Sequence, residues 1–253
     1  MWPNLLSLDA PAVAVIWQLL LARSFHVQVP WPATVLLAAC VWMIYVADRI
    51  LDTFRTRPRT ARHLFHRSHL RSLLPCAGLC ALLALGLLLT QVDARVWSAG
   101  IPMTAAMLAY FALVHAAPRP WQKYWPKELA VAILFALGTC LPVYAEAPSQ
   151  GPAMLPAVGL FASLCWINAV AIDRWERKQV AVWLVPLALT ACGLALALSF
   201  SGHLWLYGAA ALAAASLAWL TRRRERISLD KWRVLADAVL AAPALSALLV
   251  LLR

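Results

Sequence analysis

Nine stretches of about 20 mostly apolar residues follow one another along this chain of 253 residues. A helix of that length crosses the hydrocarbon core of a bilayer and pairs its own backbone polar groups. Hydrophobic residues make up 63% of the chain and charged residues 13%, so the apolar residues exceed what a soluble core of this size can bury. The sequence therefore predicts an all-α polytopic membrane protein with a single domain, 1–253. The nine predicted helices are 8–25, 33–52, 71–91, 96–116, 127–145, 153–173, 179–200, 203–221 and 233–252.

The basic residues test the number of crossings, because lysine and arginine collect in cytoplasmic loops. With the N-terminus inside, 19 of the 22 Lys and Arg residues fall in or beside the loops that follow even-numbered helices. A missing or extra helix would break this alternation. The pattern therefore predicts nine crossings with the N-terminus and the basic loops in the cytoplasm, and we expect a bacterial inner membrane. The basic loops that give the net charge of +11 would then contact anionic lipid head groups or a phosphorylated substrate. Nucleic acid is not an expected partner.

Two aspartates stand at the cytoplasmic end of the second predicted helix. Asp48 and Asp52 are four residues apart and so share one helical face. Ionisable residues at membrane depth usually face a cavity or a partner, and paired carboxylates suit Mg²⁺, above all when the ion is shared with a phosphate. A simpler interpretation is a salt bridge at the helix end with Arg49 and Arg55.

A related pattern ends the sixth predicted helix. There Asp173 is followed by an arginine and by Glu176, much as Asp48 is followed by an arginine and by Asp52. Two facing acidic clusters can hold Mg²⁺ ions between them, and these ions can in turn hold a diphosphate. The basic segments that follow both helices supply cations for phosphate oxygens.

The arrangement resembles the UbiA superfamily of intramembrane prenyltransferases, which have nine transmembrane helices around a central cavity and acidic motifs at the cytoplasmic ends of helices 2 and 6. Segment 48–52 matches the latter half of the first family motif. Arg59 falls on the second arginine of the loop that follows, and segment 57–58 lies close to the first. Segments 124–129 and 134–138 are similar to the family's entry into helix 5. The resemblance covers nearly the whole chain in topology.

The resemblance implies an enzyme that transfers an isoprenyl group from an isoprenyl diphosphate to an aromatic or other lipophilic acceptor, with Mg²⁺ as cofactor. The implied metal ligands are Asp48, Asp52, Asp173 and Glu176. The implied diphosphate-binding cations are Arg55, Arg57, Arg59, Lys123, Arg177 and Lys178. The implied catalytic residues are Asp48, Asp52, Asp173, Asn168 and Tyr45. Asn168 and Tyr45 would orient a substrate, and hydrogen bonds between helices are the simpler interpretation of both.

The chain departs from the family pattern at both acidic motifs. Tyr45 stands where the first motif has its leading aspartate. Arg177 stands where the second motif has an aspartate, four residues after Asp173. Glu176, three residues after Asp173, lies on nearly the same helical face and is the expected replacement.

Other functions fit parts of the pattern. The isoprenyl cation could cyclise within the molecule as a terpene, or the scaffold could be non-catalytic and bind a lipid diphosphate or a protein partner. A transporter is disfavoured, because it predicts glycine- and proline-interrupted helices with charges at the membrane midplane. This chain has 9 glycines, and its charges cluster at one face.

A further carboxylate, Asp237, stands just inside the ninth predicted helix. We expect it to pair with Arg233 or Lys231 rather than to take part in catalysis.

Overall fold

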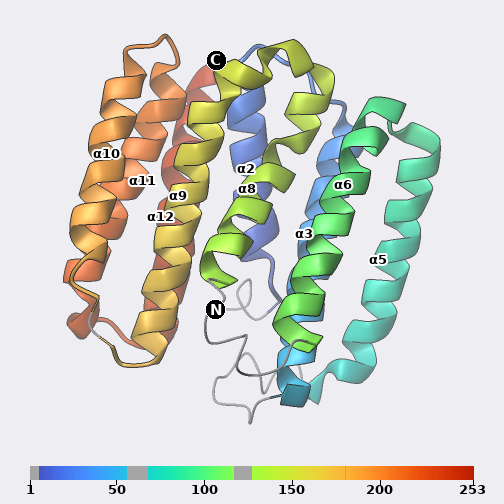
Figure 1. The fold of residues 1–253 in the computed structure, drawn as a ribbon, viewed down its shortest axis with the longest axis horizontal. Helices are drawn as coiled ribbons and strands as arrows, with labels where there is room; N and C mark the ends of the chain where they lie inside the picture. The colour runs from blue at the N-terminus through green and yellow to red at the C-terminus, as the bar shows by residue number, and fades with distance from the viewer. Residues whose placement is uncertain (1–5, 56–67, 117–126, 180) are drawn as a thin grey trace.

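The computed structural model describes residues 6–55, 68–116, 127–179 and 181–253; the side chains at 52–55, 226 and 230 lie outside this description. All regular structure in the described residues is helical (Figure 1). Its α-helices are α2 (Asp9–Ser24), α3 (Trp31–Arg55), α5 (Leu70–Gln91), α6 (Ala94–Phe111), α8 (Lys127–Glu146), α9 (Gly151–Glu176), α10 (Leu184–Ser199), α11 (Leu204–Arg222) and α12 (Leu229–Leu251). A π-helical turn, η1 (Ala112–Ala116), continues α6, and two 3-10 turns, η2 (Pro148–Gln150) and η3 (Arg224–Arg226), precede α9 and α12. The all-helical prediction is confirmed, and a helix forms in each predicted stretch.

Seven helices of the described chain are long and apolar enough to cross a membrane. They are α3, α5, α6 with its π-helical turn, α8, α9, α11 and α12. Helices α2 and α10 have 16 residues each, or about 24 Å, against about 30 Å of hydrocarbon. Leu79, Leu82 and Leu83 on α5 and Leu196 on α10 are exposed, as side chains in contact with lipid would be. These are the features of an all-α membrane protein.

The helices form two groups that α2 and α8 connect (Figure 1). In one group α10 packs on α11, and α9 and α12 lie beside them; the other group contains α3, α5 and α6. Helix α2 packs on α12 and α3, and α8 packs on α9 and α6. The ends of α3 and α9 and the starts of α8 and α12 all lie toward the lower end of the bundle in Figure 1. The fold thus brings both acidic segments to the same end of the molecule.

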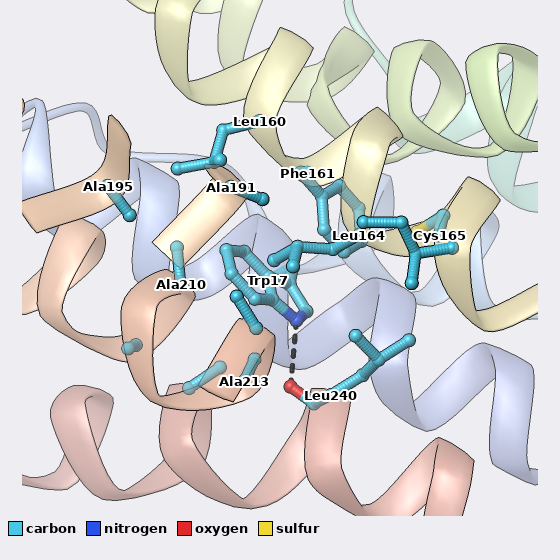
Figure 2. Packing of buried hydrophobic residues seen from close by; sticks show 14 of the residues in the cluster. Trp17, Leu160, Phe161, Leu164, Cys165, Ala191, Ala195, Ala210, Ala213 and Leu240 are labelled. Carbon is cyan, nitrogen blue, oxygen red and sulfur yellow. Dashed lines mark hydrogen bonds between the residues drawn. The ribbon is translucent and has the colours of Figure 1, made fainter. Parts of the chain in front are cut away.

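One half of the bundle is a closely packed scaffold (Figure 2). Trp17 of α2 is buried and stacks on Phe161 of α9, with ring centroids 4.4 Å apart. Its indole Nε1 donates a hydrogen bond to the carbonyl oxygen of Leu240 in α12 at 3.0 Å. Ala210 and Ala213 of α11 are buried in the same cluster, and such small side chains let helices approach closely in a membrane. Helix α11 therefore packs behind α2, α9 and α12, which contribute wall to the site described next.

Candidate functional site

A cavity of about 1110 Å³ lies among α3, α6, α8 and α9, with further contributions from α2, α5 and α12. Each of the four main helices contributes one face. The lining residues of α9 follow the helical repeat and are Cys165, Asn168, Ala169, Ile172, Asp173 and Glu176. Ligand pockets typically measure about 300–1,000 Å³, so this cavity has room for a lipid-sized molecule.

The charged residues of the lining gather at one end of the cavity. The charged and amide side chains there are Asp9, Asp48, Arg49, Lys127, Glu128, Asn168, Asp173, Glu176 and Asp237. They come from the early turns of α2, α8 and α12 and the late turns of α3 and α9, which lie at the lower end of Figure 1. Most of the remaining wall is apolar, with Leu37 on α3, Met103 on α6 and Leu141 on α8 as examples. The cavity therefore suits a ligand with a polar head and an apolar tail.

Asp48 lies on the cavity side of α3 and contacts the end of α6. Its Oδ1 is 3.2 Å from Nε2 of His115, whose side chain is 10% exposed. His115 stacks on Phe111, with ring centroids 5.5 Å apart, and belongs to the π-helical turn η1. A π-helical turn rotates the side chains that follow it, and such turns are frequent at functional sites. The turn thus carries an imidazole that contacts the first acidic segment.

The acidic segment of α9 contacts two arginines. Asp173 Oδ1 accepts a hydrogen bond from Nε of Arg177, one turn later, at 2.9 Å. Glu176 Oε1 accepts one from Nε of Arg233 on α12 at 3.0 Å, and Nη2 of Arg233 contacts the same oxygen. All three described carboxylates of the predicted metal set therefore have a nitrogen partner within the protein.

The contact between Arg233 and Glu176 predicts a stability effect. Arg233 is 2% exposed, and its neighbour Trp232 stacks on Trp175 at the same α9–α12 junction. Replacing Arg233 with methionine removes a partner of a partly buried carboxylate, so we expect the free energy of unfolding to fall by about 1–3 kcal/mol. Glu176→Gln in the same chain should recover part of this loss, because less charge is then left uncompensated. Unfolding of both single variants and the double variant in detergent measures the coupling, and strictly additive losses would contradict a direct pair.

Asn168 connects α9 to α12 within the cavity wall. Its Nδ2 donates a hydrogen bond to Oδ1 of Asp237 at 3.2 Å, and the residue is 7% exposed. The Oδ1 of Asn168 is buried, with no hydrogen-bond partner among the described residues. Tyr45 lines the cavity from α3, with its ring edge-on to Phe135 at a centroid distance of 6.4 Å. Asp237 is thus held by an amide from another helix, a contact that its sequence neighbours did not predict.

The structure brings some of the predicted site residues together. Those that line the cavity are Tyr45, Asp48, Asn168, Asp173 and Glu176. Arg177 contacts Asp173 from outside the lining, and Lys178 is exposed in the turn after α9. The side chains of Asp52 and Arg55, and residues Arg57, Arg59 and Lys123, lie outside the described part of the chain. Their predicted roles stay predictions.

Sequence reasoning missed several residues at the polar end. Arg49 and Lys127 line the cavity as cations, and Nε of Arg49 is buried without a hydrogen-bond partner in the described part of the chain. Asp9 and Glu128 also line it, and their positions in the first turns of α2 and α8 were an available signal. His115 had no comparable signal, because its contact depends on the π-helical turn.

The described carboxylates fit Mg²⁺ only as an ion shared with a ligand. Within the described ranges, no three His, Cys, Asp or Glu side chains form a group that could hold a metal. Mg²⁺ is commonly bound by one or two carboxylates together with substrate phosphates and water. Asp48 and Asp173 line one cavity from two helices, which suits that mode provided that His115 and Arg177 give up their present contacts.

Comparison of the chain with models of protein families, with curated proteins and with solved structures found no match. The interpretation of function therefore depends on the shape of the cavity and the chemistry of its residues.

Proposed function

We propose that this protein is a UbiA-like intramembrane enzyme with nine crossings, which transfers an isoprenyl group from an isoprenyl diphosphate to an aromatic or other lipophilic acceptor. The supporting observation is the cavity of about 1110 Å³, largely apolar along its length and charged at the end where α3 and α9 carry Asp48 and Asp173. An isoprenyl diphosphate has the same two parts, a long apolar tail and an anionic head. The tail would lie against α6 and α8, and the head would lie at the polar end.

The cations of the polar end would bind the diphosphate. Arg49 and Lys127 line the cavity, and Arg177 would exchange its contact with Asp173 for a phosphate oxygen. Charge-assisted hydrogen bonds from arginine to phosphate are about twice as strong as neutral ones. The cations predicted to join them are Arg55, Arg57, Arg59, Lys123 and Lys178.

The carboxylates of α3 and α9 would hold Mg²⁺ together with the diphosphate, with Asp52 and Glu176 as further predicted ligands. When bound, this ion supplies positive charge that stabilises the leaving group. The allylic C–O bond breaks and pyrophosphate leaves with the bonding electrons. The attacking atom of the acceptor forms the new bond to the allylic carbon, and the proton that the acceptor loses goes to the departing pyrophosphate. The apolar wall excludes water from the allylic cation, and Tyr45 and Asn168 orient the acceptor.

Pyrophosphate release tests this proposal. The purified protein is supplied with geranyl, farnesyl or geranylgeranyl diphosphate, Mg²⁺ and a panel of lipophilic phenols. Release that depends on the phenol, with a prenylated product, is the expected result. Release without any phenol, together with a cyclic hydrocarbon, would identify a terpene cyclase instead. Saturable binding of the diphosphates with no release under any condition would contradict an enzyme.

A non-catalytic lipid-binding protein is the second candidate. It is favoured by the contacts that His115, Arg177 and Arg233 make to the three described acids, because charges compensated within the protein hold a site together without a metal. This candidate predicts that isoprenyl diphosphates raise the unfolding temperature by the same amount with and without Mg²⁺. The enzyme predicts a larger rise with Mg²⁺ present.

Nine crossings require the short helix α10 to span the membrane. Ser149 in η2 and Glu225 in η3 are separated by α9, α10 and α11. If all three helices cross, cysteines placed at these two positions in a protein without native cysteines react with an impermeant maleimide from opposite faces. The basic surroundings of Glu225 predict that it faces the cytoplasm. Labelling of both positions from one face would show that α10 does not cross.

A further inference from the structure

Two polar side chains of the cavity lining, Asn168 and Asp237, lie deeper in the cavity than Asp173. Asn168 precedes Asp173 by five residues on α9, which is about 7.5 Å along the helix axis. Asp237 lies eight residues after the start of α12 at Leu229, or about 12 Å along that axis. Both residues line the cavity. Placing a carboxylate at this depth in a membrane costs free energy unless it faces a partner or a cavity, so Asp237 is a candidate for a role in binding.

The hydrogen bond between these residues determines what else they can bind. An ionised carboxylate only accepts hydrogen bonds, so the amide of Asn168 must direct its Nδ2 toward Asp237. That orientation leaves the Asn168 carbonyl oxygen buried, and it has no partner among the described residues. Buried polar atoms in proteins are nearly always hydrogen-bonded. The carbonyl oxygen of Asn168 can therefore accept a hydrogen bond from a bound molecule.

We propose that Asn168 and Asp237 form a binding site for a head group that donates a hydrogen bond, a hydroxyl or an ammonium, on a second lipophilic molecule. The inference rests on the proposed function, in which this molecule is the acceptor. Its O–H or N–H donates to the buried carbonyl oxygen of Asn168, and the hydrogen bond from Asn168 Nδ2 to Asp237 holds the amide in that orientation. Cys165 and Leu240 line the neighbouring wall and suit an apolar ring or chain.

A pair of ligands that differ only in the donor tests the site. 4-Octylphenol and its methyl ether share size and apolar surface, but the ether has no O–H. We expect the full-length protein in detergent to bind the phenol about tenfold more tightly, because the ether leaves the buried oxygen of Asn168 unpaired. Octylamine is the third ligand, and tighter binding of octylamine than of the phenol would identify an ammonium as the preferred donor. The ligand-induced rise in unfolding temperature gives the affinities.

Asn168→Leu removes the acceptor and leaves an apolar helix residue, so this variant should bind the phenol and the ether equally. Asp237→Leu removes the carboxylate that orients the Asn168 amide, so it should weaken the discrimination as well, and it answers the same question if Asn168→Leu does not fold. Glu128→Gln is the matched control, because it removes another carboxylate of the lining and should leave the discrimination intact. A wild-type protein that binds neither donor better than the ether, or an equal loss of discrimination in Asn168→Leu and Glu128→Gln, would overturn the proposal.

Binding is measured without any isoprenyl diphosphate, which separates this inference from the enzyme itself. Discrimination that depends on Asn168, in a protein that releases no pyrophosphate, would support the head-group site and contradict the transferase. Phenol-dependent pyrophosphate release without such discrimination would support the transferase and contradict the site.

Discussion

Replacing Asp48 or Asp173 with asparagine is expected to reduce turnover of an isoprenyl diphosphate by at least about a hundredfold. Each change keeps the side-chain volume and removes one anionic ligand from the polar end of the cavity. Stabilisation of a leaving group by a metal ion contributes several kcal/mol, and each 1.36 kcal/mol corresponds to about a tenfold change in rate. The rate of pyrophosphate release at saturating substrate measures the effect.

Asp93→Asn is the control for this experiment. Asp93 accepts a hydrogen bond from the backbone N–H of Arg95 at the start of α6, and asparagine caps a helix about as well as aspartate. This position lies at the other end of α6 from the polar residues, so its loss of charge should leave turnover unchanged. Full activity in Asp48→Asn and Asp173→Asn would rule out the metal-assisted reaction. A fall in turnover in Asp93→Asn as large as in the other two variants would show a general loss of folding.

If the proposed transferase activity is correct, Gly100→Leu is expected to shift its substrate preference toward shorter isoprenyl chains. Gly100 lies on the apolar part of the wall, 15 residues before His115 and so about 22 Å away along α6 and its π-helical turn. Beyond its chain neighbours and the local helix backbone, a Cβ atom added there meets nothing within 4 Å, and Gly100 lines the cavity, so the new side chain has room to extend into it. A single methylene in an apolar pocket changes kcat/KM by about 10–200-fold. The kcat/KM for geranylgeranyl diphosphate should therefore fall at least about tenfold, and that for geranyl diphosphate should change little.

Gly193→Leu is the matched control. A Cβ atom added at Gly193 on α10 also has open space around it. Gly193 is exposed, however, and does not line the cavity. Both variants gain the same helix propensity, about 0.8–1.0 kcal/mol relative to glycine. Only the cavity variant should change the ratio of kcat/KM between long and short substrates. An equal loss for all chain lengths in Gly100→Leu would contradict a tail bound against α6.

The positions of the helices could be predicted from the sequence, because the length of an apolar stretch is set by the thickness of the bilayer. Each predicted stretch, from 8–25 to 233–252, contains a helix. The gathering of Asp48 and Asp173 at one end also follows from the sequence. Both end even-numbered helices, and the basic residues beside them indicate a common side of the membrane.

The contacts of the site could not be predicted in this way. Asp48 meets His115, Glu176 meets Arg233, and these partners are 67 and 57 residues apart in the chain. Sequence neighbours had suggested Arg49 and Arg55 as partners of Asp48, and the side chain of Arg55 lies outside the described part of the chain.

The physical reason is that a membrane helix is apolar on the sides that face lipid and on the sides that face other helices. Its sequence therefore does not show how the helix is rotated about its axis, which in a soluble protein the polar face would indicate. Each apolar stretch of the sequence predicted a helix and the end of that helix at which its charged residues lie. Only the packing of α9 against α12, and the π-helical turn after α6, decided which nitrogens reach Asp48 and Glu176 and that Asn168 and Asp237 share one wall of the cavity.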